Sequence, residues 1–318
     1  MFKIVNKLIR RLLILIKRAQ RFANQTHRYD FPSENNGWRK SSNKQVYGNR
    51  QTHSVFDPFA FVHGSDIYML VSERKENGID LLKSMDGYSW HFVRKILNNV
   101  PHSWQKLVNR PSIVFHNGVW HLWYTGQSPE VSCIAHATSN NILHFENSNI
   151  PCIKADLPQE GESVMNPCVL WNNEKMCFQM WYAAGETYEP DAIFYAESQD
   201  GDLWIKRKEP VLTKYADHKW ECAKVGGCDV KLQADGTYCM YYIGYQNVDV
   251  ARICYATSSD GIHWERPDDN LLLSPTRNHF DSDATYKPSV IEFKGKLYMW
   301  YNGRRGDEEY IGLATKEL

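Results

Sequence analysis

Residues able to act as acids, bases or anion-binding groups stand at equivalent points of a repeated pattern. In four places such a residue directly precedes a proline that opens an apolar run, and in a fifth place a glycine precedes Cys228. The residues before these five anchors are Asp57, Arg110, Asn166, Gly227 and Lys287. One carboxylate, two cations and an amide would meet if the fold brought these positions around one axis. Such a group suits proton transfer to a polar substrate and the binding of phosphate or hydroxyl groups.

A second set of polar residues follows the aromatic runs of the same repeats and would lie at the same mouth. Its members are Glu73, Arg74, Gln127, Glu186, Gln246, Arg304 and Arg305. Arg304 would add a donor for phosphate or hydroxyl groups, and Glu186 would add a carboxylate. An internal ring of ion pairs among Asp57, Arg110 and Lys287 is the purely structural alternative.

A third set lies about seven residues before the anchors, where an aromatic residue precedes a polar one. It comprises Trp104-Gln105, Trp220-Glu221 and Phe280-Asp281. Glu221 is therefore a candidate second carboxylate. The recurrence also fits a structural role, in which the ring packs and the polar residue caps.

The spacing of the anchors indicates the elements that position these residues. Pro58, Pro111, Pro167, Cys228 and Pro288 are 53, 56, 61 and 60 residues apart. Each anchor opens a strand-like run. This run is followed by a polar turn and an aromatic run, and in most repeats by a third apolar run. Three or four short strands per unit are typical of propeller blades. The sequence therefore predicts an all-β fold, a five-bladed β-propeller over residues 51–318, whose first strands line a central channel.

A Ser-x-Asp-Gly-x-x-Trp motif recurs at residues 84–90, 198–204 and 258–264. Asp-Gly favours a tight turn, and we expect the tryptophan to pack between neighbouring blades. The last repeat stops before its own copy of this motif. Asn36-Gly37-Trp38, within a polar linker over residues 23–50, is therefore a candidate for the outer strand that closes the ring.

Residues 1–22 contain seven basic residues, no acidic residue and apolar residues at helical spacing. This pattern predicts a basic amphipathic helix, typical of segments that lie on an anionic membrane surface. The apolar stretch over residues 12–16 is too short for a signal-peptide core. We therefore expect a cytoplasmic protein, either free or peripheral at the inner face of the membrane. A basic tail packed on the domain is the alternative.

Composition excludes several classes of protein. Lys and Arg number 37, as do Asp and Glu, so the overall charge does not favour a nucleic-acid partner. The hydrophobic fraction of 42% and mean hydropathy of −0.54 are typical of a globular protein. The eight cysteines form no CxxC pair. We expect no metal and no cofactor, with inorganic phosphate as the co-substrate to test.

The repeats, the Asp57-Pro58 opening and the Met-Trp-Tyr and Ser-x-Asp-Gly-x-x-Trp motifs resemble the five-bladed propeller superfamily of glycoside hydrolase families 43, 32 and 130. In the fourth repeat, Trp220-Glu221-x-x-Lys224-Val225-Gly226-Gly227 is similar to a segment of family 130, the mannoside phosphorylases and hydrolases. The resemblance implies a glycoside hydrolase or a phosphorylase-like enzyme. It also implies that Asp57 is a catalytic carboxylate and that Lys224 lies in the active site.

The chain departs from these families at positions that matter for the chemistry. Asn166 stands where family 43 has an aspartate, and Gly226 stands where families 43 and 32 have the acid glutamate. The second carboxylate therefore stays open among Glu221, Glu186 and Glu162. A phosphorylase needs only one carboxylic acid, because phosphate is the nucleophile. The cations that would hold this phosphate are Arg110, Lys224, Lys287 and Arg304, with Asn166 beside them.

Three classes of function fit these observations. The first is a carbohydrate-active enzyme that cleaves or transfers a glycosyl unit in the central funnel, by hydrolysis or phosphorolysis. The second is a membrane-associated glycosyltransferase or accessory factor in surface polysaccharide synthesis. The third is a non-catalytic sugar-binding propeller. The expected ligand is an oligosaccharide, a polysaccharide or an activated sugar.

Overall fold

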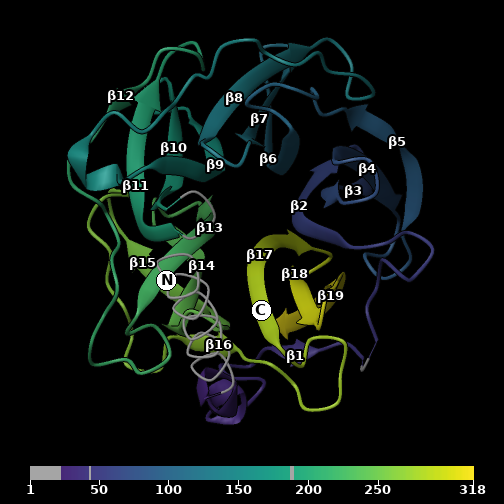
Figure 1. Cartoon of the computed structure of the whole chain (residues 1–318), viewed down its shortest axis with the longest axis vertical. Helices are drawn as coiled ribbons and strands as arrows, with labels where there is room; N and C mark the ends of the chain where they lie inside the picture. The colour runs from purple at the N-terminus through teal and green to yellow at the C-terminus, as the bar shows by residue number, and fades with distance from the viewer. Residues whose placement is uncertain (1–22, 43, 187–189) are drawn as a thin grey trace, which may run out of the picture.

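Five antiparallel sheets surround a central axis (Figure 1). The structure is a computed structural model that describes residues 23–42, 44–186 and 190–318. Four of the sheets have four strands and one has three. The short 3-10 helices η1 (Thr26–Tyr29) and η2 (Pro158–Glu160) lie outside the sheets. The predicted all-β, five-bladed propeller is confirmed.

Each blade is a run of antiparallel strands, and the first strands of neighbouring blades contact one another in a closed cycle. Blade one contains β2 (Val55–His63), β3 (Asp66–Glu73), β4 (Gly78–Ser84) and β5 (His91–Leu97). Blade two contains β6 (Leu107–His116), β7 (Val119–Gln127) and β8 (Ser132–Ser139). Blade three contains β9 (Ser163–Asn172), β10 (Cys177–Gly185), β11 (Pro190–Ser198) and β12 (Ile205–Lys206). Blade four contains β13 (Lys224–Leu232), β14 (Tyr238–Asn247), β15 (Val250–Ser258) and β16 (Leu271–Leu273). Blade five contains β17 (Ala284–Phe293), β18 (Lys296–Arg305), β19 (Glu308–Glu317) and β1 (Arg39–Lys40).

The fifth blade takes its outermost strand from the N-terminal part of the described chain. β1 pairs antiparallel with β19, and Arg39 lies opposite Thr315. Trp38, directly before β1, is 2% exposed, and its ring packs edge-on against Tyr241 with 6.1 Å between the ring centroids. Segments from both ends of the described chain therefore share the sheet of blade five. The contact between Trp38 and Tyr241 of blade four joins this sheet to its neighbour in the ring.

The Ser-x-Asp-Gly-x-x-Trp motif forms a turn that contacts the neighbouring blade. In blade one, Asp86 Oδ1 accepts two backbone N–H groups at 2.8 Å, and Gly87 adopts a φ of 78°. The carbonyl oxygen of Gly87 accepts one bond from Trp90 Nε1 and a second from Trp300 Nε1 of blade five, at 3.1 and 3.0 Å. The glycine supplies the left-handed backbone that the turn requires.

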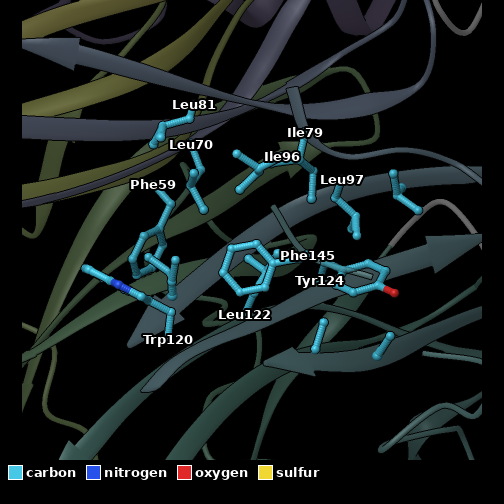
Figure 2. Close-up of a cluster of buried hydrophobic side chains, with 14 residues drawn as sticks. Phe59, Leu70, Ile79, Leu81, Ile96, Leu97, Trp120, Leu122, Tyr124 and Phe145 are labelled. Carbon is cyan, nitrogen blue, oxygen red and sulfur yellow. The ribbon is translucent and has the colours of Figure 1, made fainter. Parts of the chain in front are cut away.

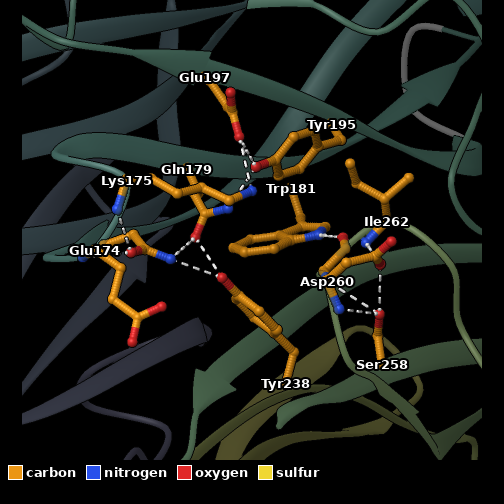
Figure 3. Close-up of polar contacts among 12 residues, drawn as sticks. Glu174, Lys175, Gln179, Trp181, Tyr195, Glu197, Tyr238, Ser258, Asp260 and Ile262 are labelled. Atoms are coloured by element: carbon orange, nitrogen blue, oxygen red, sulfur yellow. Dashed lines mark hydrogen bonds and ion pairs between the residues drawn. The ribbon is translucent and has the colours of Figure 1, made fainter. Parts of the chain in front are cut away.

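The same contact joins blades three and four (Figure 3). There the indole of Trp181 donates to the carbonyl oxygen of Gly261 at 2.8 Å. Beside it, Tyr238 donates to Gln179 Oε1 at 2.9 Å, which adds a buried polar contact between the two blades. These bonds satisfy polar groups that would otherwise be buried without partners.

The apolar core fills the spaces between blades. Figure 2 shows the cluster between blades one and two, where Phe59 and Leu70 pack with Trp120 and Leu122. Leu70 and Leu122 are completely buried. Because each blade packs on two neighbours, the ring holds the first strands in fixed positions around the channel.

The predicted amphipathic helix over residues 1–22 lies outside the described residues. Within the described ranges, no helix combines the length and the apolar character needed to cross a membrane. Within the same ranges, no group of three or more His, Cys, Asp or Glu side chains is arranged to hold a metal ion.

Candidate active site

In four blades, the residue before the anchor proline has a left-handed backbone conformation. The φ angles are 53° at Asp57, 56° at Arg110, 56° at Asn166 and 50° at Lys287. In blades one, two, four and five, the pairing between the first and second strands also shifts register at this point. A β-bulge of this kind turns a side chain out of the regular ladder. Non-glycine residues rarely adopt this backbone, so its repetition points to a built site.

The neighbouring blade holds three of these strained residues by their backbone N–H groups. In each case a side chain on the second strand of the preceding blade accepts the bond. The bonds run from Asp57 to Asn302 Oδ1 (2.8 Å), from Arg110 to Ser72 Oγ (3.0 Å) and from Asn166 to Thr125 Oγ1 (3.1 Å). The contacts between blades therefore fix the backbone from which the channel side chains project.

Five of the residues predicted to act in catalysis or ligand binding line one cavity of about 270 Å³. They are Asp57, Arg110, Asn166, Lys287 and Arg304. This volume is close to the lower end of the range for ligand pockets, which is about 300 Å³. The cavity therefore suits a small ligand, about the size of one sugar ring. The cavity is also lined by Arg74, Tyr245, Asp249 and Tyr286, together with smaller and apolar residues.

The charged side chains of the cavity are mostly cationic. Its lining includes the four cations Arg74, Arg110, Lys287 and Arg304 and the two carboxylates Asp57 and Asp249. Arg110 Nη1 and Arg304 Nε are buried, and neither has a hydrogen-bond partner among the described residues. Such donors are suited to an incoming anion or to several hydroxyl groups.

Asp57 is the buried carboxylate of the cavity. It is 5% exposed, and Ser72 Oγ lies 3.4 Å from its Oδ2. Burial raises the pKa of Asp57, while the charges of Arg110 and Lys287 act in the opposite direction. A carboxyl group with a raised pKa holds a proton more strongly and can deliver it to a leaving oxygen.

Gly227 occupies the fourth position of the same ring because Asn166 packs against it. A Cβ atom at Gly227 would lie 2.6 Å from Asn166 Cγ. This distance is well inside normal contact, so any side chain there would displace Asn166. The glycine in the fourth repeat therefore makes room for the amide of the third.

Glu221 lies elsewhere, inside blade four, and does not line the cavity. It is completely buried. Its carboxylate accepts bonds from His218 Nδ1 (2.8 Å), Asn270 Nδ2 (2.9 Å), Tyr242 Oη (2.6 Å) and Arg266 Nε (3.0 Å). Four partners occupy the carboxylate, so it has the environment of a structural ion pair.

The equivalent residues of three other blades make the same contact. Each polar residue accepts a hydrogen bond from a tyrosine of the second strand in its own blade. The pairs are Gln105 with Tyr124 (2.7 Å), Glu160 with Tyr182 (2.7 Å), Glu221 with Tyr242 (2.6 Å) and Asp281 with Tyr301 (3.2 Å). Glu221 thus belongs to a repeated feature of the blades.

Three further candidates, Glu162, Glu186 and Lys224, also lie outside the cavity lining. Glu186 is exposed and directly follows β10, next to residues 187–189, which lie outside the described ranges. Lys224 is 6% exposed, and its Nζ lies 4.7 Å from the ring centroid of Tyr245. Because Tyr245 lines the cavity, Lys224 is a neighbour of the cavity wall.

Sequence reasoning missed Tyr286, Tyr245 and Asp249 as lining residues. Tyr286 directly precedes Lys287, so the anchor pattern contained a signal for it. Asp249 lies in the turn between β14 and β15, and its position depends on the length of that one turn. No repeated pattern marks such a residue.

Comparison with known proteins shows a consistent likeness. Residues 103–235 match the model of the glycosyl hydrolases family 32 N-terminal domain. The uncharacterized protein MT1551 of Mycobacterium tuberculosis is 29% identical over 211 residues, which cover 62% of this chain and 67% of that protein. A second uncharacterized protein of the same species, Rv1502, is 28% identical over the same shares.

Solved structures share the fold over most of the chain. One described as a glycoside hydrolase has a TM-score of 0.73 at 17% identity, over 86% of this chain and 90% of its own. A thermostable family-43 glycoside hydrolase has a TM-score of 0.67 at 19% identity, over 82% and 88%. A structure from the family of mannoside phosphorylases that contains hydrolases of beta-1,2 mannosidic linkages has a TM-score of 0.65 at 15% identity, over 83% and 84%. The expected likeness to glycoside hydrolase propellers is confirmed, and the fold is the one these enzymes use.

Proposed function

We propose that this protein is a carbohydrate-active enzyme that cleaves or transfers a glycosyl unit in the cavity around Asp57. The observation that carries the proposal is the position of Asp57. It is a buried carboxylate on a strained backbone, and it shares a cavity with Arg110, Asn166 and Lys287. The likeness to glycoside hydrolase propellers supports the choice of substrate class.

In this proposal Asp57 delivers a proton to the glycosidic oxygen of the substrate. Its raised pKa favours the protonated form that this role requires. Arg110, Lys287 and Arg304 bind the polar groups of the sugar or an inorganic phosphate, and Asn166 donates to a hydroxyl group. Lys224 supports the cavity through Tyr245.

If the glycosyl unit is transferred in a single displacement, the attacking group is either water or phosphate. The surplus of cations in the cavity supports phosphate as a co-substrate, since phosphorolysis needs only one carboxylic acid. Neither Glu186 nor Glu221 lines the cavity. We therefore propose a structural role for Glu221 and do not assign either residue as the second carboxylate.

Membrane association through residues 1–22 remains a separate proposal based on their basic composition. It would place the enzyme beside lipid-linked or nucleotide-linked sugars in surface polysaccharide synthesis. Binding of the full chain to anionic and to neutral vesicles tests this proposal. Equal binding to both would contradict it.

The test of the enzymatic proposal uses manno-, gluco-, galacto- and arabino-oligosaccharides, with and without inorganic phosphate. Free sugar and sugar 1-phosphate are measured separately. We expect turnover on at least one oligosaccharide, and phosphate-dependent sugar phosphate would identify phosphorolysis. Binding of an oligosaccharide without turnover would instead support a non-catalytic sugar-binding propeller.

A further inference from the structure

Tyr286, Glu309 and Arg74 form a connected set at the edge of the cavity, and the proposed function leaves this set without a role. Tyr286 Oη donates a hydrogen bond to Glu309 Oε1. Arg74 donates to Glu309 Oε2 through Nη2 at 2.9 Å and through Nε at 3.2 Å. Tyr286 and Arg74 line the cavity, while Glu309 is 8% exposed.

This arrangement has the three parts of an activated nucleophile. A hydroxyl group is a weak nucleophile until a neighbouring base takes its proton, and a third group commonly orients that base. Here Tyr286 supplies the hydroxyl, Glu309 supplies the base and Arg74 holds the base in place. Burial and the charge of Glu309 raise the pKa of Tyr286 well above its usual value, so the phenol stays protonated at rest.

The cations of the same cavity indicate the charge of the sugar. Arg110 Nη1 and Arg304 Nε are buried donors without hydrogen-bond partners among the described residues. A carboxylate on the sugar would satisfy both donors. A carboxylate nucleophile would be repelled by such a sugar, whereas a neutral phenol would not. Some glycosidases use a tyrosine nucleophile for this reaction.

We propose that Tyr286 is the nucleophile toward glycosides of a sugar acid, with Glu309 as its base and with Arg110 and Arg304 binding the sugar carboxylate. This inference rests on the proposed function, and it names the substrate class and the second catalytic group of the same cavity.

The reaction has two balanced steps. In the first step, Tyr286 Oη bonds to the anomeric carbon while the bond from that carbon to the leaving oxygen breaks. The phenol proton passes to Glu309, and Asp57 gives its proton to the leaving oxygen. In the second step, water bonds to the anomeric carbon and gives a proton to Asp57. The tyrosyl oxygen leaves and recovers its proton from Glu309.

The first experiment compares 4-methylumbelliferyl glycosides of neutral sugars with those of glucuronic acid and N-acetylneuraminic acid. We expect turnover of an acidic probe. Tyr286→Phe should lower kcat on that probe by about 10³-fold or more, with little change in KM. Tyr255→Phe is the matched control, because its hydroxyl contacts Cys239 Sγ at 3.1 Å and does not line the cavity. The control should keep the wild-type rate.

The second experiment uses the wild-type protein, so it does not depend on the folding of a variant. A fluorinated glycosyl fluoride of the acidic sugar traps the covalent intermediate, and peptide mass spectrometry locates it. We expect the adduct on Tyr286. An adduct on Asp57, or full turnover by Tyr286→Phe, would overturn the inference.

The outcomes separate this inference from the proposed function. Turnover of neutral glycosides alone would overturn the inference and leave the proposed function standing. No turnover of any probe or oligosaccharide would overturn both.

Discussion

Asp57 combines a left-handed backbone with a side chain that is 5% exposed. Both properties cost free energy of folding, because non-glycine residues avoid this backbone and a buried carboxylate loses its hydration. The structure retains both, and the site places Arg110 and Lys287 where their charges act on this carboxylate. A cost of this kind at one residue is typical of functional sites.

The raised pKa of Asp57 predicts how stability depends on pH. The folded protein holds this proton more strongly than the unfolded chain, whose aspartate has a pKa of 3.8. The stability that this group contributes is therefore complete below the unfolded pKa and is lost as pH rises through the folded pKa. We expect Asp57→Asn to raise Tm relative to wild type near about pH 7, and to raise it less near about pH 4. Thermal melts at both pH values test this, and a larger gain at the lower pH would contradict it.

Glu221 provides the opposite case at the residue scale. Glu221→Gln removes the negative charge that Arg266 and His218 contact inside blade four. We expect the free energy of unfolding to fall by about 3–5 kcal/mol, because a buried cation loses its partner. Turnover per folded molecule should change little. The control Glu186→Gln alters an exposed residue and should change stability by less than about 0.5 kcal/mol. Loss of turnover in Glu221→Gln with normal stability would show that Glu221 takes part in the chemistry.

At the scale of elements, the backbone of the residue before the anchor determines what reaches the channel. In four first strands this residue is left-handed, and its type decides whether a carboxylate, a cation or an amide enters the cavity. Gly227 is the exception, because Asn166 fills the space beside it. The third and fourth blades are therefore coupled at this point.

Gly227→Ala tests this coupling between blades. The new methyl group would meet Asn166 Cγ at 2.6 Å and displace it. We expect a loss of about 1–3 kcal/mol in stability and a fall in turnover of about 10²-fold. Asn166 Cβ would itself lie 2.8 Å from the new methyl group, so relief of the clash requires glycine at position 166. The double variant Gly227→Ala/Asn166→Gly should lose less stability than the sum of the single changes, without recovering turnover. Additive losses of stability in the double variant would contradict a direct clash.

The repeats allowed much of this architecture to be predicted from the sequence. Asp57, Arg110, Asn166 and Lys287 could be placed together because one pattern recurs before the anchors. Arg304 could be placed because the ends of the second strands meet at the same mouth. These predictions use only periodicity, which the propeller converts into a ring.

The rest of the site depends on contacts that do not repeat. Glu309 on β19 bonds to Tyr286 on β17, although β18 lies between these two strands in the sheet, and it also pairs with Arg74 of blade one. Such a set follows from the packing of two particular blades, so no spacing in the sequence marks it. Glu221 is the opposite case. Its position repeats as a polar residue in four blades, but the side chain lies inside a blade and away from the channel.

At the scale of the whole molecule, closure of the ring maintains the cavity. The cavity draws residues from every blade, including Asp57 of blade one and Lys287 of blade five, so it requires that those two blades meet. β1 completes blade five, and Trp38 anchors this segment against Tyr241. Stability of the ring and geometry of the site are therefore linked.

Trp38→Ala tests this link. Removal of a buried indole should lower the free energy of unfolding by about 3–5 kcal/mol. Leu203→Ala is the control, because Leu203 is 77% exposed, and it should be nearly neutral. Denaturant titrations measure both changes. Equal stability of the two variants would show that the N-terminal segment does not support the ring.

The most direct test of the central claim compares wild type with Asp57→Asn on an oligosaccharide that the wild type cleaves. Released sugar is measured in parallel with calorimetric binding of the same oligosaccharide. We predict that Asp57→Asn loses turnover by about 10³-fold or more while it still binds the oligosaccharide. Wild-type turnover in Asp57→Asn would contradict the assignment of the catalytic centre to this cavity.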